Sequence, residues 1–123
     1  MSGLVDKSAD ARSKTIGSNF RVRAWVNFNG GNNGSVGIRD SGNVSSIARN
    51  SAGVYDVNFI NKPPYTNQYC VSVSGNVNNS NQDTKRACHR VVEFNQDSFK
   101  IVCGFGNTDS KEDQEFLVAS AIW

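Results

Sequence analysis

The feature that most constrains this chain is an alternation of apolar and polar residues that begins at Phe20. From residue 20 to residue 28 every second residue is apolar, and the residues between them are polar except for Trp25. A period of two is typical of a β-strand that buries one face. Comparable segments recur along the chain, separated by runs of Gly, Asn, Ser, Asp or Pro, at residues 36–38, 44–48, 55–59, 69–73, 88–94, 99–105 and 115–123.

This series predicts an all-β fold. About eight short strands with turn signals every ~8–12 residues are the pattern of an antiparallel β-sandwich, with a jelly roll as one variant of it. The apolar composition agrees, because the chain has 14 Val and 6 Ile but only 2 Leu, and β-branched residues suit a pleated sheet. A chain of 123 residues fits one domain. We therefore expect an extended N-terminal arm over residues 1–18 and a β-sandwich domain over residues 19–123.

The last expected strand, "EFLVASAIW" at residues 115–123, is apolar on both faces. A strand with two apolar faces is covered on both sides. One face can line the core, and the other would meet a second subunit. We expect that second, subunit-facing set to be Leu117, Ala119, Ala121 and Trp123.

Charge, hydropathy and cysteine content exclude several classes of protein. A net charge of +2 provides no strong field toward nucleic acid or an acidic membrane. No apolar run approaches the roughly 20 residues of a membrane span, and the polar start "MSGLVDKSADARSK" has no hydrophobic region of a signal peptide. We interpret Cys70, Cys88 and Cys103 as thiols made in a reducing cytoplasm, with one bridge and one free thiol as the alternative.

Residues suited to catalysis are few. His89 is the single histidine, and it follows Cys88 in an expected strand, where neighbours point to opposite faces. Cys70 or Cys103 could approach His89 only through the fold, so a surface or interface histidine is the simpler interpretation. The segment around Lys111 reads as a solvated acidic loop, although its carboxylates are also hard calcium ligands: Asp109, Glu112, Asp113 and Glu115.

Other carboxylates do not form a distinctive pair for glycoside hydrolysis. They lie in turns or in expected strands, at Asp40, Asp56, Asp83, Glu93 and Asp97. No zinc-ligand spacing is present either. We therefore expect a protein that is not an enzyme and has no cofactor, metal or catalytic residue.

The stretch "WVNFNGGNNGS" at residues 25–35 raises the question of a ligand site. A phosphate cradle needs a helix N-terminus, but the strand-like "SVGIRD" follows, so the stretch predicts a hairpin turn. Sugar binding stays open, because an exposed aromatic ring beside amides can stack on a sugar and bond its hydroxyls. Trp25, Tyr65 and Tyr69 are the candidate glycan contacts. Packing of Trp25 against a neighbouring subunit is the alternative.

Three phrases in residues 10–60 resemble a recurrent module of bacteriophage virion proteins, found near the end of tail-fibre-like proteins of marine and cyanobacterial phages. They are "AWVNFNG" at 24–30, "IRDSGNVSSI" at 38–47 and "GVYDVNF" at 53–59. Residues beyond 60 resemble the module only in their general order of strand-like segments and polar loops. The resemblance names no catalytic residue, and it implies an exposed, non-enzymatic, homotrimeric virion protein.

About 20 residues precede the module, too few to form the shaft of a fibre. The resemblance therefore implies a fibre fragment or a stand-alone module, such as a capsid decoration (cement) protein or a short knob on head or tail. Its expected partners are other copies of itself and either the major capsid protein or tail and fibre proteins. The alternative is a fibre-tip module that binds host surface glycans. Either way we expect synthesis in the host bacterial cytoplasm and a final place on the virion surface.

Overall fold

The computed structural model describes residues 21–32, 35–76, 87–105 and 111–123. The expected arm at residues 1–18 lies outside these ranges. The described residues form eight strands and no helix, so the predicted all-β class is confirmed. The strands are β1 (Val22–Asn32), β2 (Ser35–Gly42), β3 (Val44–Ser51), β4 (Val54–Phe59), β5 (Cys70–Asn76), β6 (Ala87–Phe94), β7 (Ser98–Phe105) and β8 (Phe116–Ile122).

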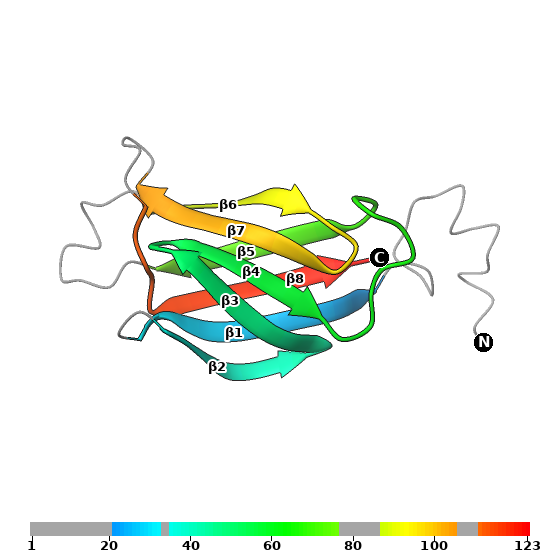
Figure 1. Ribbon diagram of the computed structural model, residues 1–123, viewed down its shortest axis with the longest axis horizontal. Helices are drawn as coiled ribbons and strands as arrows, with labels where there is room; N and C mark the ends of the chain where they lie inside the picture. The colour runs from blue at the N-terminus through cyan, green and yellow to red at the C-terminus, as the bar shows by residue number, and fades with distance from the viewer. Residues whose placement is uncertain (1–20, 33–34, 77–86, 106–110) are drawn as a thin grey trace, which may run out of the picture.

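Two antiparallel sheets of four strands lie face to face (Figure 1). Sheet A has the strand order β2-β1-β8-β5, and sheet B has the order β3-β4-β7-β6. The hairpin expected from "NGGNNGS" is confirmed, because β1 pairs with β2. Three consecutive strand pairs, β1–β2, β3–β4 and β6–β7, are neighbours within one sheet. The fold is therefore a β-sandwich, and the jelly-roll variant, in which most consecutive strands change sheet, does not fit this order.

The core lies between the sheets and follows the predicted alternation. In β1 the inward residues Ala24, Val26 and Phe28 are fully buried. In sheet B the inward residues of β4 and β7 face them. These are Tyr55, Val57 and Phe59 from β4, and Phe99, Ile101 and Cys103 from β7.

The predicted subunit-facing set of β8 is wrong. Leu117, Ala119 and Ala121 are 0%, 5% and 0% exposed and belong to the core. The reason is the register: Leu117 is paired with Phe28, Ala119 with Val26 and Ala121 with Ala24. Residues directly opposite each other on paired strands share a face, so the core pattern of β1 sets that of β8. Phe116 and Val118 are the exposed residues instead.

Trp123 also points inward. Its ring centroid lies 5.3 Å from that of Phe59 and 6.1 Å from that of Tyr69, both edge-on. Such edge-to-face contacts are favourable beyond the area they bury. Backbone hydrogen bonds of 3.2 Å join Trp123 to Arg21 in both directions, which fixes the two ends of the described domain side by side.

Candidate functional site

The outer faces of the two sheets differ in character. On sheet B the outward polar side chains bond to one another. Asn50 Nδ2 donates to Asp56 Oδ2 at 2.7 Å, and Asn58 Nδ2 donates to Ser46 Oγ at 3.2 Å. An ion pair of 3.0 Å joins Lys100 to Glu93 on the same sheet. On this face the outward polar side chains therefore pair with one another across the strands.

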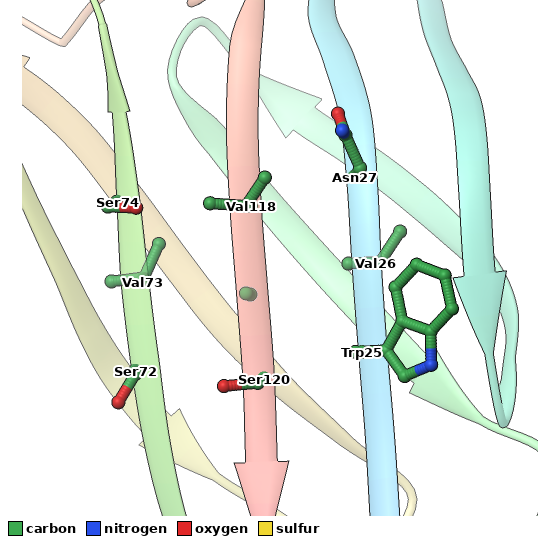
Figure 2. Close-up of a pocket in the computed structure, with 9 residues that line it drawn as sticks. Trp25, Val26, Asn27, Ser72, Val73, Ser74, Val118 and Ser120 are labelled. Carbon is green, nitrogen blue, oxygen red and sulfur yellow. The ribbon is translucent and has the colours of Figure 1, made fainter. Parts of the chain in front are cut away.

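Sheet A carries an open groove of about 440 Å³ on its outer face (Figure 2). Its floor is β8, at Val118 and Ser120, and its sides are β1 and β5. Trp25 and Asn27 stand on the β1 side, and three further residues of β5 line the other: Ser72, Val73 and Ser74. Among these lining residues none is charged. Val26, Val73 and Ala119 also line the groove, but their side chains belong to or pack against the core. The outward side chains are therefore one aromatic ring, the aliphatic Val118, three hydroxyls and an amide.

Trp25 is 41% exposed, and the indole lies over the backbone of β2 at Gly42, its paired residue. A Cβ atom built on Gly42 would come within 2.4 Å of the indole Nε1 and 2.9 Å of Cδ1. Real Cβ contacts are never that short, so any larger residue here would displace the ring. Gly42 thus lets the indole lie close to the sheet, beside the groove.

The polar groups of the groove have unused hydrogen-bonding capacity. Within the described part of the chain, the hydroxyls of Ser72, Ser74 and Ser120 have no side-chain hydrogen bond. Asn27 Oδ1 accepts a bond of 3.2 Å from Arg39 Nη1, which leaves its Nδ2 group free to donate. Arg39 is fixed beyond the groove by a 2.8 Å bond to the Glu115 carbonyl and by its position 4.4 Å from the centroid of the Phe116 ring.

The structure separates the three predicted glycan contacts. Trp25 is exposed at the groove, as expected of a contact residue. Tyr65 is 63% exposed, but it lies in the loop between β4 and β5 and does not line the groove. Tyr69 is 7% exposed, and its hydroxyl donates to the carbonyls of Asn95 and Ser98 at 2.8 and 3.0 Å. Burial raises the pKa of Tyr69 to about 12, and the prediction of a Tyr69 contact is wrong.

The fold does place a cysteine opposite the single histidine. His89 of β6 is paired with Cys103 of β7, so both side chains share the inner face. A thiol attacks as the thiolate, but burial, followed by the charges of Asp113 and Cys88, raises the pKa of Cys103 to about 12. His89 Nε2 instead contacts the buried Oε1 atom of Gln114. The Cys103 thiol is therefore buried in the core, and the imidazole of His89 is engaged with Gln114. All three cysteines are free thiols, as predicted.

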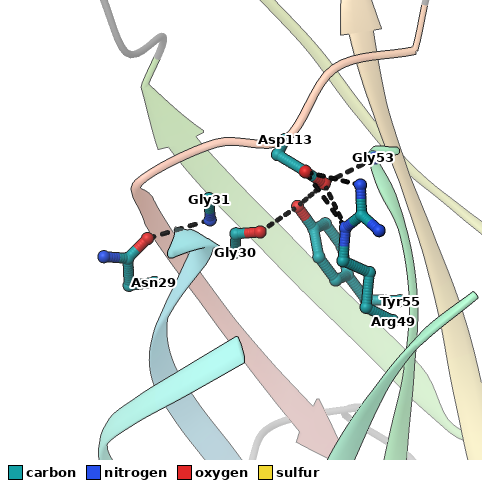
Figure 3. A network of polar contacts seen from close by, with 7 residues as sticks. All are labelled: Asn29, Gly30, Gly31, Arg49, Gly53, Tyr55 and Asp113. Carbon is teal, nitrogen blue, oxygen red and sulfur yellow. Dashed lines mark hydrogen bonds and ion pairs between the residues drawn. The ribbon is translucent and has the colours of Figure 1, made fainter. Parts of the chain in front are cut away.

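The expected solvated acidic loop contains a structural carboxylate (Figure 3). Asp113 Oδ1 accepts hydrogen bonds from the Tyr55 hydroxyl at 2.8 Å, from Gly53 N at 2.8 Å and from Arg49 Nε at 3.0 Å. Asp113 Oδ2 accepts from Arg49 Nη2 at 2.8 Å. For Asp113 the expectation of a solvated side chain is wrong, because these donors fasten the segment before β8 to β3 and β4.

The electrostatics of this cluster follow from its partners. Burial alone would raise the pKa of Asp113, but the hydrogen bonds from Arg49, Gly53 and Tyr55, with the charge of Arg49, hold it below its ordinary value. Burial and then Asp113 raise the pKa of Tyr55. Gly53 has a φ of +70°, and a Cβ there would lie 2.5 Å from the carbonyl oxygen of Cys103. Only glycine fits this turn. In this conformation the backbone N–H of Gly53 donates to Asp113.

Among the described residues, no group of three or more His, Cys, Asp or Glu side chains could hold a metal ion. Asp56, Glu93 and Asp97 have side-chain partners in Asn50, Lys100 and Lys62. Asp109 and Asp83 lie outside the described residues. Within the described ranges, no helix has the length and hydropathy needed to cross a membrane.

Comparison with known proteins finds no matching family model, no matching curated protein and no matching solved structure.

Proposed function

We propose that this chain is a non-enzymatic structural protein of a bacteriophage virion, exposed on the particle surface as a capsid decoration (cement) protein or as a subunit of a short fibre or knob. The observation that carries the proposal is the resemblance of residues 24–30, 38–47 and 53–59 to the phage module. These phrases fall on β1, on β2 and β3, and on β4 with the Gly53 turn before it. The likeness thus covers the segments that build one half of the sandwich core.

A structural role is supported by what the chemically reactive groups contact. His89 contacts Gln114, the Cys103 thiol is buried, and the Asp113 carboxylate accepts hydrogen bonds from Arg49, Gly53 and Tyr55. Each contact joins one strand or segment to another. In this proposal these groups stabilise the domain and take no part in a reaction.

The proposed virion protein is a homotrimer, attached to the capsid or to tail and fibre proteins through residues 1–18. Because the inward residues of β8 belong to the core of one subunit, a contact between subunits would use other apolar side chains. Val22, Ile38 and Phe116 of sheet A are 55%, 39% and 48% exposed and lie outside the groove. Repeated attachment of many copies converts weak individual contacts into tight binding.

Deletion of residues 1–18 tests the attachment. We expect the truncated protein to keep its unfolding midpoint and its all-β circular dichroism spectrum, because the described sandwich begins after the arm. We expect it to lose binding to purified particles that lack the protein, measured by co-sedimentation against the full chain. If the truncated and full chains decorated particles equally, residues 1–18 would not be the attachment segment.

A second candidate function is recognition of host surface glycans by this exposed domain. The observation that favours it is the groove on sheet A, where Trp25 stands beside hydroxyls that have no partner in the described chain. A virion protein with such a groove could contribute to host attachment. The two functions are compatible, because the arm and the groove lie in different parts of the chain.

A further inference from the structure

We infer that the groove on the outer face of sheet A binds an uncharged oligosaccharide chain, laid across the strands from Trp25 over Ser120 to Ser72. This inference deepens the second candidate function and rests on it. It names the chemical class of the ligand, its direction on the sheet, and Gly42 as the residue that positions the aromatic ring.

The chemistry of the groove matches a sugar. A pyranose ring has an apolar C–H face and a rim of hydroxyls. The exposed indole of Trp25 and the methyl groups of Val118 suit the C–H face. The hydroxyls of Ser72, Ser74 and Ser120 can each donate and accept, and Asn27 Nδ2 can donate. A ligand with many neutral donors and acceptors is the one that these groups can satisfy.

The register gives the direction. Ser120 of β8 is paired both with Trp25 of β1 and with Ser72 of β5. The three residues therefore form one row across the sheet. Their backbones span two strand spacings, about 10 Å, and the indole, which lies over β2, extends the row beyond β1 (Figure 2). A short oligosaccharide spans such a row. Val118 and Ser74, also paired with each other, flank it in the next row with Asn27.

Charge and size favour this ligand over the alternatives. No lining residue is charged, and the Arg39 guanidinium at the edge of the groove is held by Asn27 Oδ1 and the Glu115 carbonyl, so the lining itself favours a neutral ligand over an acidic polysaccharide. A second protein subunit needs about 800 Å² per partner for a stable contact. The exposed apolar side chains Val22, Ile38 and Phe116 lie outside the groove lining, and Arg39 stands over one face of the Phe116 ring. A volume of about 440 Å³ is instead within the range of small-ligand sites.

Gly42 is the positioning residue. Its missing side chain permits the indole to lie over β2, and a methyl group there would collide with Nε1 and Cδ1. Gly42 has no positive φ, so Gly42→Ala is compatible with the backbone. This substitution moves the ring while leaving it in the protein, which separates the orientation of Trp25 from its presence.

The test uses the full chain in solution without particles. Maltohexaose and N-acetylchitohexaose serve as uncharged probes and a hexamer of mannuronate as the charged one. Binding is followed in NMR titrations by the indole N–H signal of Trp25 and, in every variant including Trp25→Ala, by the backbone amide signals of Asn27 and Val118, which also line the groove. Sedimentation gives the oligomeric state. We expect at least one uncharged probe to shift this signal saturably, and the charged probe to leave it unchanged.

Substitutions inside and outside the groove test which residues contribute to binding. We expect Trp25→Ala to weaken binding of that probe more than tenfold, Gly42→Ala to weaken it about fivefold, and the double change Ser72→Ala with Ser120→Ala to weaken it severalfold. Tyr65→Ala is the matched control, an exposed aromatic outside the groove, and should bind as the wild type does. Thermal unfolding confirms that each variant is folded.

Three outcomes would overturn the inference: no shift with either uncharged probe at 10 mM, a shift with the mannuronate hexamer alone, or a change of oligomeric state in Trp25→Ala without any ligand effect. The last outcome would identify the groove as a subunit contact. None of them bears on attachment to particles, which depends on residues 1–18, so failure here is distinguishable from failure of the proposed virion role.

Discussion

Asp113→Asn is expected to lower the free energy of unfolding by about 2–3 kcal/mol. The amide keeps one acceptor oxygen for the Tyr55 hydroxyl and Gly53 N, but it loses the negative charge and places N–H groups toward Arg49 Nη2. Hydrogen bonds to a charged group are stronger than neutral ones, and the donors left behind are partly buried. Urea unfolding followed by tryptophan fluorescence measures the change.

Asp97→Asn is the matched control. Asp97 forms an ion pair of 2.6 Å with Lys62, but the two side chains are 71% and 56% exposed. An exposed pair contributes little, so we expect a change within about 0.5 kcal/mol. Equal effects of the two substitutions would mean that Asp113 does not fasten the segment before β8.

The same carboxylate predicts a pH dependence. The folded-state pKa of Asp113 lies below its ordinary value, which is about 4 in an unfolded chain. Between these two values the unfolded state binds more protons, so stability rises with pH there. The contribution of Asp113 is complete above pH ~4 and is lost as the pH falls through the folded pKa. We expect the stability difference between wild type and Asp113→Asn to shrink below pH ~4. A difference independent of pH would contradict this assignment.

Leu117→Ala is expected to lower the free energy of unfolding by about 3 kcal/mol, because it removes a fully buried side chain and leaves a cavity between the sheets. Val118→Ala, at the next position of β8, changes a residue that is 41% exposed and should stay within about 0.5 kcal/mol. Denaturant unfolding of the two variants compares them directly. The reverse ranking would show that β8 has the opposite face in the core.

The case of β8 shows where sequence patterns are sufficient and where they are not. In β1 and β4 only one face is apolar, so the alternation alone identified Val26, Phe28 and Val57 as inward residues. In β8 both faces are apolar, and the pattern has two equivalent solutions. Pairing with β1 selects between them, and this pairing joins residues nearly a hundred positions apart. A one-residue change of phase reverses every side chain of a strand, which is why the whole expected set was wrong.

The groove was only partly predictable. Trp25 stood out because an aromatic residue occupied the polar phase of a strand. Ser72, Ser74 and Ser120 were not distinctive, because serine is common along this chain and an outward serine in a strand is ordinary. They gain meaning only when β8 brings β5 beside β1. Asp113 resembled its acidic neighbours for the same reason: its partners Arg49, Gly53 and Tyr55 are about 60 residues away.

The measurement that tests the central proposal most directly is the number of copies of this chain per purified virion, by quantitative mass spectrometry against the major capsid protein. We expect the chain to remain with particles through density-gradient purification. We expect its copy number per particle to be fixed and to be a multiple of three. Hundreds of copies would place it on the head as a decoration protein, and a few to a few tens would place it on the tail or a fibre. Its absence from purified particles, with the protein present in the infected cell, would contradict a structural role in the virion.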